Sequence, residues 1–172
     1  MKRILVLTSL SLVAVFAITS LAGGQTVPVR GTLESITAST TPKRDRTRPY
    51  TFTTRGRIVP PPRFCAAGAR PGTGAANCIP INCPAGTTNA AYCIPPTVAQ
   101  VCSGKVAVRF RKGRTTVSSR TVNLRSNCTY RSRVPLRIRI FTRRGTLSVR
   151  ARFQGNSLLS PKVSATRRVR AG

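Results

Sequence analysis

Apolar and basic residues alternate along the C-terminal part of the chain, between Ser103 and Arg170. From Val134 to Ile140 every second residue is apolar, and Arg or Pro occupies the positions between them. The same alternation recurs in Thr146–Phe153 and in Lys105–Arg111. Because successive side chains of a strand point to opposite faces, a period of two predicts strands with one buried face and one face in water. The wet face of these strands carries mainly arginine.

Turn signals divide this region into five predicted strands. They are Ser103–Lys112, Arg114–Leu124, Arg131–Ile140, Thr146–Phe153 and Val163–Arg170, with breaks at Gly113, Arg143–Gly145 and Gln154–Asn156. Val117 is out of phase with Val122 and Leu124, which predicts a β-bulge in the second strand. No window of the chain after the leader shows a sustained helical period.

Before Pro60 the alternation is weaker. We predict two strands there, Val29–Ser39 and Tyr50–Val59, joined by a polar, basic turn over Thr40–Pro49. Gly56 inside the second strand predicts a bulge or bend.

About seven short strands at this spacing predict an all-β fold, an immunoglobulin-like antiparallel β-sandwich. Strands from residues 23–62 and 102–172 would share one core, and residues 63–101 would form a long insertion between the second and third strands. An alternative treats the insertion as a linker between a small N-terminal piece and an independent C-terminal domain.

The insertion is rich in Cys, Pro and Gly and contains an internal repeat. Each copy has the form Cys-x-Ala-Gly, a loop, then Cys-Ile-Pro; the first starts at Cys65 and the second at Cys83. A duplicated unit most simply closes on itself, which predicts disulfides Cys65–Cys78 and Cys83–Cys93. Cys102 and Cys128 lie near the open end of one hairpin and form the third predicted pair. Six cysteines permit roughly 15 pairings, so the other arrangements stay open.

Residues 1–22 are predicted to be a signal peptide. Lys2 and Arg3 precede the apolar run Ile4–Ile18, and small residues lie at the end of the segment, with cleavage after Ala22 or after Gly24. We expect no transmembrane span after cleavage, and a secreted protein, either free or held at the cell envelope. An oxidising compartment agrees with the predicted disulfides.

The chain also resembles a known family. Phe153-Gln154-Gly155-Asn156, followed by Leu158 to Pro161 and Ser164, is similar to the last hairpin of bacterial immunoglobulin-like repeat domains. Most of Thr41–Gly172 resembles exported Ig-like proteins of GC-rich bacteria, which share the segment Pro49–Pro61, a cysteine loop and the ending TRRVRAG. The resemblance implies an extracytoplasmic domain with a structural, adhesive or carbohydrate-adjacent role, and it brings no known catalytic residues.

The composition argues against catalysis. The chain has 30 Lys and Arg but only 2 acidic residues, Glu34 and Asp45, and no His. General acid–base catalysis usually needs a His or a pair of carboxylates. We therefore expect no catalytic residues, no cofactor and no small-molecule substrate. Cys78 and Cys83 have a spacing that could bind zinc, but without His and in an oxidising compartment disulfides are favoured over a metal.

The outward arginines are the feature with functional content. The net charge of the whole chain is +28. Guanidinium groups bind phosphate, sulfate or carboxylate through paired hydrogen bonds and stay charged at any working pH. The predicted polyanion-binding residues are Arg109, Arg111, Arg133, Arg137, Arg139, Arg150, Arg152, Arg168 and Arg170. A simpler interpretation is a solvated face that keeps the protein soluble and protects sheet edges.

Two functional hypotheses follow from this charge. The first is a structural or adhesive module at the cell envelope that attaches electrostatically to an anionic cell-wall or surface polymer. The alternative is a secreted cationic defence protein or a protein that binds nucleic acid non-specifically. Proteins that recognise a nucleic-acid sequence usually expose aromatic rings for base stacking. Aromatic residues are few here, and most lie at strand positions predicted to face the core.

Overall fold

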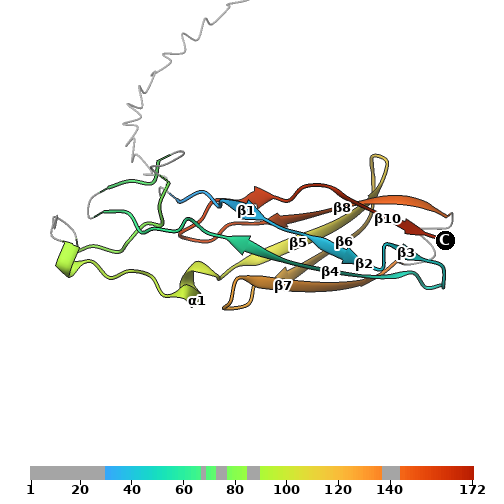
Figure 1. The fold of residues 1–172 in the computed structure, drawn as a ribbon, viewed down its shortest axis with the longest axis horizontal. Coiled ribbons are helices and arrows are strands. Elements are labelled where there is room, and N and C mark those ends of the chain that lie inside the picture. The colour runs from blue at the N-terminus through green and yellow to red at the C-terminus, as the bar shows by residue number, and fades with distance from the viewer. Residues whose placement is uncertain (1–29, 67–68, 73–76, 85–89, 137–143) are drawn as a thin grey trace, which may run out of the picture.

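Most of the regular structure in the described part of the chain consists of strands, which are arranged in two sheets. A computed structural model describes residues 30–66, 69–72, 77–84, 90–136 and 144–172. The strands run along the long axis of the molecule, with the cysteine-rich loops at one end and the last strand at the other (Figure 1). This arrangement confirms the all-β prediction. Within the described residues, no helix is long and apolar enough to span a membrane.

The smaller sheet has four strands. They are β1 (Ser35–Ile36), β2 (Ser39–Thr41), β4 (Thr51–Val59) and β7 (Thr129–Pro135). The central strand β4 pairs antiparallel with β1 and β2 along one edge and with β7 along the other.

The larger sheet has six strands. They are β3 (Arg44–Asp45), β5 (Lys105–Lys112), β6 (Thr115–Asn123), β8 (Gly145–Phe153), β9 (Lys162–Val163) and β10 (Arg167–Ala171). Their order is β3-β10-β8-β5-β6, with β9 also pairing with β8. All pairs are antiparallel except β3 and β10, which run parallel.

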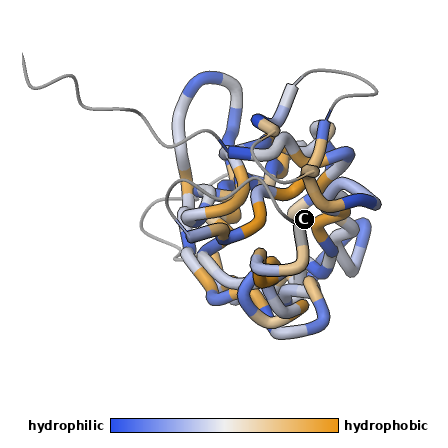
Figure 2. The backbone as a smooth tube through the Cα atoms, turned by 90° about the vertical axis from the view of Figure 1, so that its left-hand side faces the viewer, coloured by the Kyte–Doolittle hydropathy of each residue, from blue (hydrophilic) through white to orange (hydrophobic). Residues whose placement is uncertain are grey.

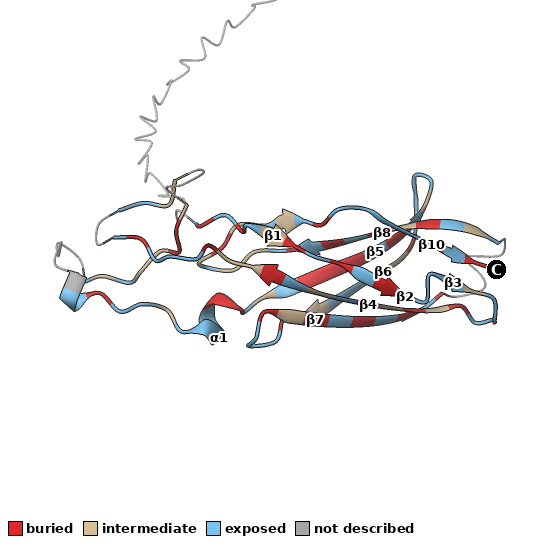
Figure 3. Ribbon diagram, viewed as in Figure 1, coloured by how far each residue is buried: buried red, intermediate tan, exposed pale blue. Residues whose placement is uncertain are grey.

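One hydrophobic core lies between the sheets and takes side chains from both. Phe52 of β4 and Phe110 of β5 are fully buried, and their ring centroids are 5.8 Å apart. Buried and exposed residues alternate along β7 and β8, as the period of two predicts (Figure 3). Seen end-on, hydrophobic segments gather inside the molecule and hydrophilic segments lie towards its outside (Figure 2).

The first predicted strand, Val29–Ser39, is interrupted and shifted. β1 and β2 pair with β4 in one continuous register, but Thr37 and Ala38 between them depart from it. The carbonyl of Thr37 accepts a hydrogen bond from the Tyr130 hydroxyl at 2.7 Å. The hydroxyl of Thr37 accepts the Arg57 amide at 3.1 Å in place of that carbonyl. The apolar phase itself changes earlier, between the buried residues Leu33 and Ile36, whereas Ile36, Ala38 and Thr40 are buried at alternate positions.

Gly56 does not form the predicted bulge, because β4 and β7 pair without a shift across it. Its strand partner is Tyr130, whose ring lies over the glycine. A Cβ at Gly56 would lie 2.0 Å from the Thr37 carbonyl oxygen and 2.6 Å from the Tyr130 hydroxyl. Glycine is therefore needed here for close approach of a side chain and a carbonyl.

Three further predictions have clear outcomes. The bulge at Val117 is confirmed: Phe110 pairs with Ser118 and Arg111 with Thr116, which leaves Val117 without a partner. The predicted turn Thr40–Pro49 was wrong in part, because it contains β3 and the end of β2. The predicted strand Val163–Arg170 is divided into β9 and β10, with the Ser164 hydroxyl accepting the Ala151 amide at the break.

Where the structure describes it, the cysteine-rich segment contains little regular structure and is held by disulfides. Cys65 binds Cys78 and Cys83 binds Cys93, the pairings that the internal repeat predicts. A 3-10 turn (η2, Ala90–Tyr92) lies within the second copy of the repeat, and a short helix (α1, Val98–Val101) follows that copy. The sequence prediction did not include the helix. Disulfides of this kind form and persist in oxidising compartments.

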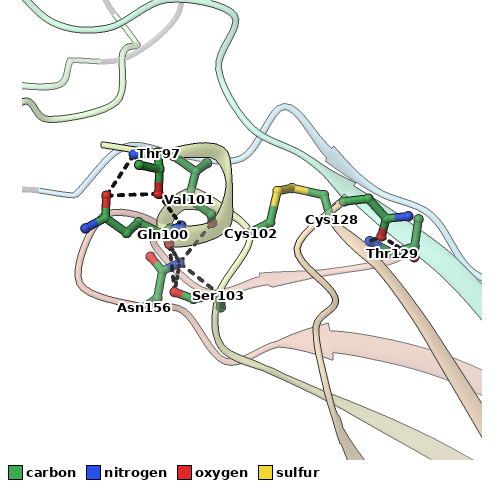
Figure 4. Close-up of a disulfide and its surroundings, with 9 residues drawn as sticks. Thr97, Gln100, Val101, Cys102, Ser103, Cys128, Thr129 and Asn156 are labelled. Atoms are coloured by element: carbon green, nitrogen blue, oxygen red, sulfur yellow. Dashed lines mark hydrogen bonds between the residues drawn. A yellow bond between two sulfur atoms is a disulfide. The ribbon is translucent and has the colours of Figure 1, made fainter. Parts of the chain in front are cut away.

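The third disulfide, Cys102–Cys128, joins the two sheets (Figure 4). Cys102 ends α1 just before β5, and Cys128 just precedes β7, so the bridge connects neighbouring ends of strands from different sheets. The Cα atoms are 4.6 Å apart. The bridge thus fixes the sheets to each other where the cysteine-rich segment returns to the core.

Asn156 supports the same junction from the other side (Figure 4). Its amide nitrogen donates to the carbonyls of Val101 and Ser103, each at 3.0 Å. Its side-chain oxygen accepts the amides of Leu158 and Leu159 at 2.9 and 2.7 Å. One side chain therefore joins the end of α1 to the loop after β8.

We expect the buried phenol of Tyr130 to lower the free energy of unfolding at alkaline pH. Burial raises the pKa of Tyr130, so the neutral phenol stabilises the fold below the unfolded pKa of about 10, and this contribution is lost as the pH rises above it. Tyr130→Phe should cost about 1 kcal/mol at neutral pH, because the Thr37 carbonyl loses its donor. Between pH values of about 9 and 11, stability should fall more steeply in the wild type than in the variant. Urea unfolding with intact disulfides measures both; equal slopes would contradict the assignment.

Replacing Asn156 with alanine should destabilise the protein by about 1–3 kcal/mol, because the carbonyls of Val101 and Ser103 and the amides of Leu158 and Leu159 lose their partner. Urea unfolding gives the change in free energy. Asn123→Ala is the matched control: Asn123 is exposed on β6, and its replacement should change stability by less than about 0.5 kcal/mol. Equal effects of the two substitutions would show that Asn156 does not hold the junction.

Candidate functional site

Six of the predicted polyanion-binding arginines lie together on the outer face of the larger sheet. Arg109 and Arg111 project from β5, and the others project in pairs from β8 and β10. Those on β8 are Arg150 and Arg152, and those on β10 are Arg168 and Arg170. All six side chains are exposed. Arg133 is also exposed, but it lies on β7 and therefore on the smaller sheet. Arg137 and Arg139 lie outside the described residues.

Strand register brings two of these arginines directly opposite each other. Arg109 of β5 pairs with Arg150 of β8, and one position along the same face Arg111 lies opposite Ser148. Ser148 in turn pairs with Arg168 of β10. Neighbouring strands are about 5 Å apart, and residues on one face of a strand repeat every 7 Å or so, which makes the array dense.

These side chains surround a hollow of about 610 Å³, the arginine trough. It crosses β5, β8 and β10. Its lining consists of Arg109, Arg111, Gly113, Ser148, Arg150, Thr166 and Arg168. Hydroxyl and guanidinium donors thus converge on one space, which is the arrangement that phosphate, sulfate or carboxylate oxygens require.

Internal hydrogen bonds orient two of the guanidinium groups. Arg150 Nε donates to Thr166 Oγ1 at 2.5 Å, and Arg111 Nη2 donates to the Arg114 carbonyl at 2.6 Å. Each bond uses one edge of the guanidinium, and the group carries further N–H donors. The side chains are therefore partly positioned before any ligand binds.

A separate cluster of arginines lies at the β3 edge of the same sheet and includes residues that the sequence did not point to. β3 places Arg44 directly beside Arg170 of β10. Arg44 Nε donates to the Gly172 carbonyl at 3.1 Å. The charge of Arg46, followed by slight burial and the charges of Arg170 and Arg144, lowers the pKa of Arg44. Like charges therefore crowd this edge as they crowd the trough.

Neither acidic residue neutralises the trough. Asp45 uses its carboxylate locally, accepting the amides of Thr47 at 3.0 Å and Thr51 at 2.7 Å. Glu34 is exposed and directly precedes β1, a strand of the smaller sheet. Lys162, the one lysine of β9, donates to the carbonyls of Leu33 and Glu34 and so has a structural role.

Exposed aromatic residues lie elsewhere. Phe64 and Tyr92 are 46% and 65% exposed, and both belong to the cysteine-rich segment. None of the residues that line the trough is aromatic. The trough can therefore bind charge and hydrogen-bond acceptors but offers no ring for base stacking.

Comparison with family models, with curated proteins and with solved structures found no match to this chain. Function must therefore be inferred from the geometry of the described residues.

Arg109→Gln should raise the melting temperature at low ionic strength, because like charges directly opposite on a sheet destabilise it. The gain should disappear at about 0.5 M salt, where such charges are screened. Thermal unfolding at both salt concentrations measures the effect. Arg63→Gln removes the same charge from an exposed position in the cysteine-rich segment and is the control. A salt-independent gain, or an equal gain in the control, would show that Arg109 and Arg150 do not repel each other measurably.

Proposed function

We propose that the protein is an exported, non-catalytic immunoglobulin-like module that attaches electrostatically to anionic polymers at a cell envelope. The observation that carries the proposal is the arginine trough, in which Arg109, Arg150 and Arg168 surround one hollow without an acidic neighbour. A linear polyanion would supply the missing negative charge and release its counterions.

Strand order supports the immunoglobulin-like assignment. Immunoglobulin domains place strands A, B and E in one sheet and C, F and G in the other, and variable-type domains add C′ beside C. The order β1/β2-β4-β7 corresponds to A-B-E, and β10-β8-β5-β6 corresponds to G-F-C-C′. The described residues contain no counterpart of strand D, and Cys102–Cys128 joins other strands than the disulfide of antibody domains does.

Export is supported by the sequence of residues 1–22 and by the disulfides. The three bridges use all the cysteines of the chain. A chain stapled in this way would lose its bridges in a reducing cytosol. An envelope polymer is also the kind of anion that a protein would meet after export.

A dextran sulfate column tests the charge mechanism. Retention of the wild type should weaken steeply as salt rises from about 0.05 to 0.5 M. The triple variant R109Q/R150Q/R168Q should elute at lower salt, and the slope of log affinity against log salt should become shallower by about one for each arginine that no longer binds the polymer. Retention that ignores salt would overturn the mechanism.

The matched control is R63Q/R70Q/R125Q, which removes the same charge from exposed positions outside the trough. It should elute close to the wild type. Sedimentation with isolated bacterial cell walls then tests the envelope partner, with double-stranded DNA as the competing polyanion. Binding to DNA but not to walls would contradict the envelope role.

A further inference from the structure

The outer face of the smaller sheet carries a second group of exposed arginines, which we call the second arginine face. It consists of Arg55 and Arg57 of β4 and Arg131 and Arg133 of β7. Arg55 pairs directly with Arg131, as Arg109 pairs with Arg150 on the larger sheet. Threonines lie beside the other two, with Thr53 opposite Arg133 and Thr129 opposite Arg57.

The two faces point in opposite directions. Residues that alternate with the arginines of the smaller sheet, among them Phe52 and Val134, are buried in the same core as Phe110 and Val149 of the larger sheet. Because both inner faces pack on this shared core, both outer faces point away from it. A single molecule is therefore cationic on two opposite sides.

This separation allows two polyanions to bind at once. Packed sheets lie about 10 Å apart, and the arginine side chains extend beyond them on each side. The Debye length at physiological ionic strength is about 8 Å. Two polymer chains bound on opposite faces therefore repel each other only weakly. Two polymer chains bound side by side on one face would repel each other more strongly, because the protein would not separate them.

We propose that one molecule binds two anionic polymer chains, one in the arginine trough and one on the second arginine face, and so cross-links them. The inference rests on the proposed function, since it takes the same class of ligand. It adds a second site and an activity: the protein joins polymer chains in addition to adhering to them. Each face binds through several weak contacts, so the joint would hold by multivalency and loosen with salt.

A two-step capture experiment tests the cross-link. Immobilised dextran sulfate is saturated with protein and washed, and soluble fluorescent dextran sulfate is then passed over the layer at low salt. The wild type should capture the fluorescent polymer. If it binds the layer but captures nothing, the cross-link is wrong while the proposed attachment stands; if it does not bind the layer, the proposed function itself fails.

Charge-matched variants identify the faces. R109Q/R111Q/R150Q/R168Q and R55Q/R57Q/R131Q/R133Q should each still bind the layer, but capture should fall to the level of a protein-free layer. The control R30Q/R63Q/R70Q/R125Q removes four exposed arginines that lie on neither face, and it should capture like the wild type. Thermal unfolding verifies that each variant is folded. Full capture by either face variant, or loss of capture in the control, would overturn the two-face assignment.

Discussion

Repulsion among unbalanced guanidinium groups is the constraint on which this structure depends. With 30 basic and 2 acidic residues, ion pairs inside the chain cannot neutralise the charge. Alternation along β4, β5, β7, β8 and β10 points most of their arginines outward and leaves an uncharged core around Phe52 and Phe110. Burial of that core and the Cys102–Cys128 bridge oppose the repulsion that would otherwise separate the sheets.

The same constraint links stability to binding. A sheet fixes the spacing of its side chains, so Arg109 and Arg150 cannot move apart as two arginines on a flexible chain would. Part of the ordering that an anion would require is therefore already present before it arrives, which favours affinity. A ligand that binds only the folded protein also stabilises it. Under the proposed function, a bound polyanion would therefore stabilise the folded state.

The local residue pattern was sufficient to predict the strands with regular alternation, the bulge at Val117 and the disulfide pairing. It was not enough for β3, because Arg44 and Asp45 become a strand only through parallel pairing with β10, far away in sequence. Alternation also says whether Arg133 points outward but not which sheet carries it. The short helix was accessible: Thr97 and Gln100 form a capping box that the sequence displays. The hydrogen bond from Tyr130 to the Thr37 carbonyl joins residues 93 positions apart, so no local pattern reveals it.

The duplicated cysteine units have an evolutionary consequence. Each of the bridges Cys65–Cys78 and Cys83–Cys93 closes within its own copy, so neither copy needs the other to be cross-linked. The first copy is attached to the segment before β1 through Asn77, whose side chain exchanges two hydrogen bonds with the backbone of Thr32. The second copy ends where α1 leads into β5. The loop inside each bridge can therefore change in length without disturbing the strand pairing, whereas Ile79 ties the first copy to the hydrophobic core.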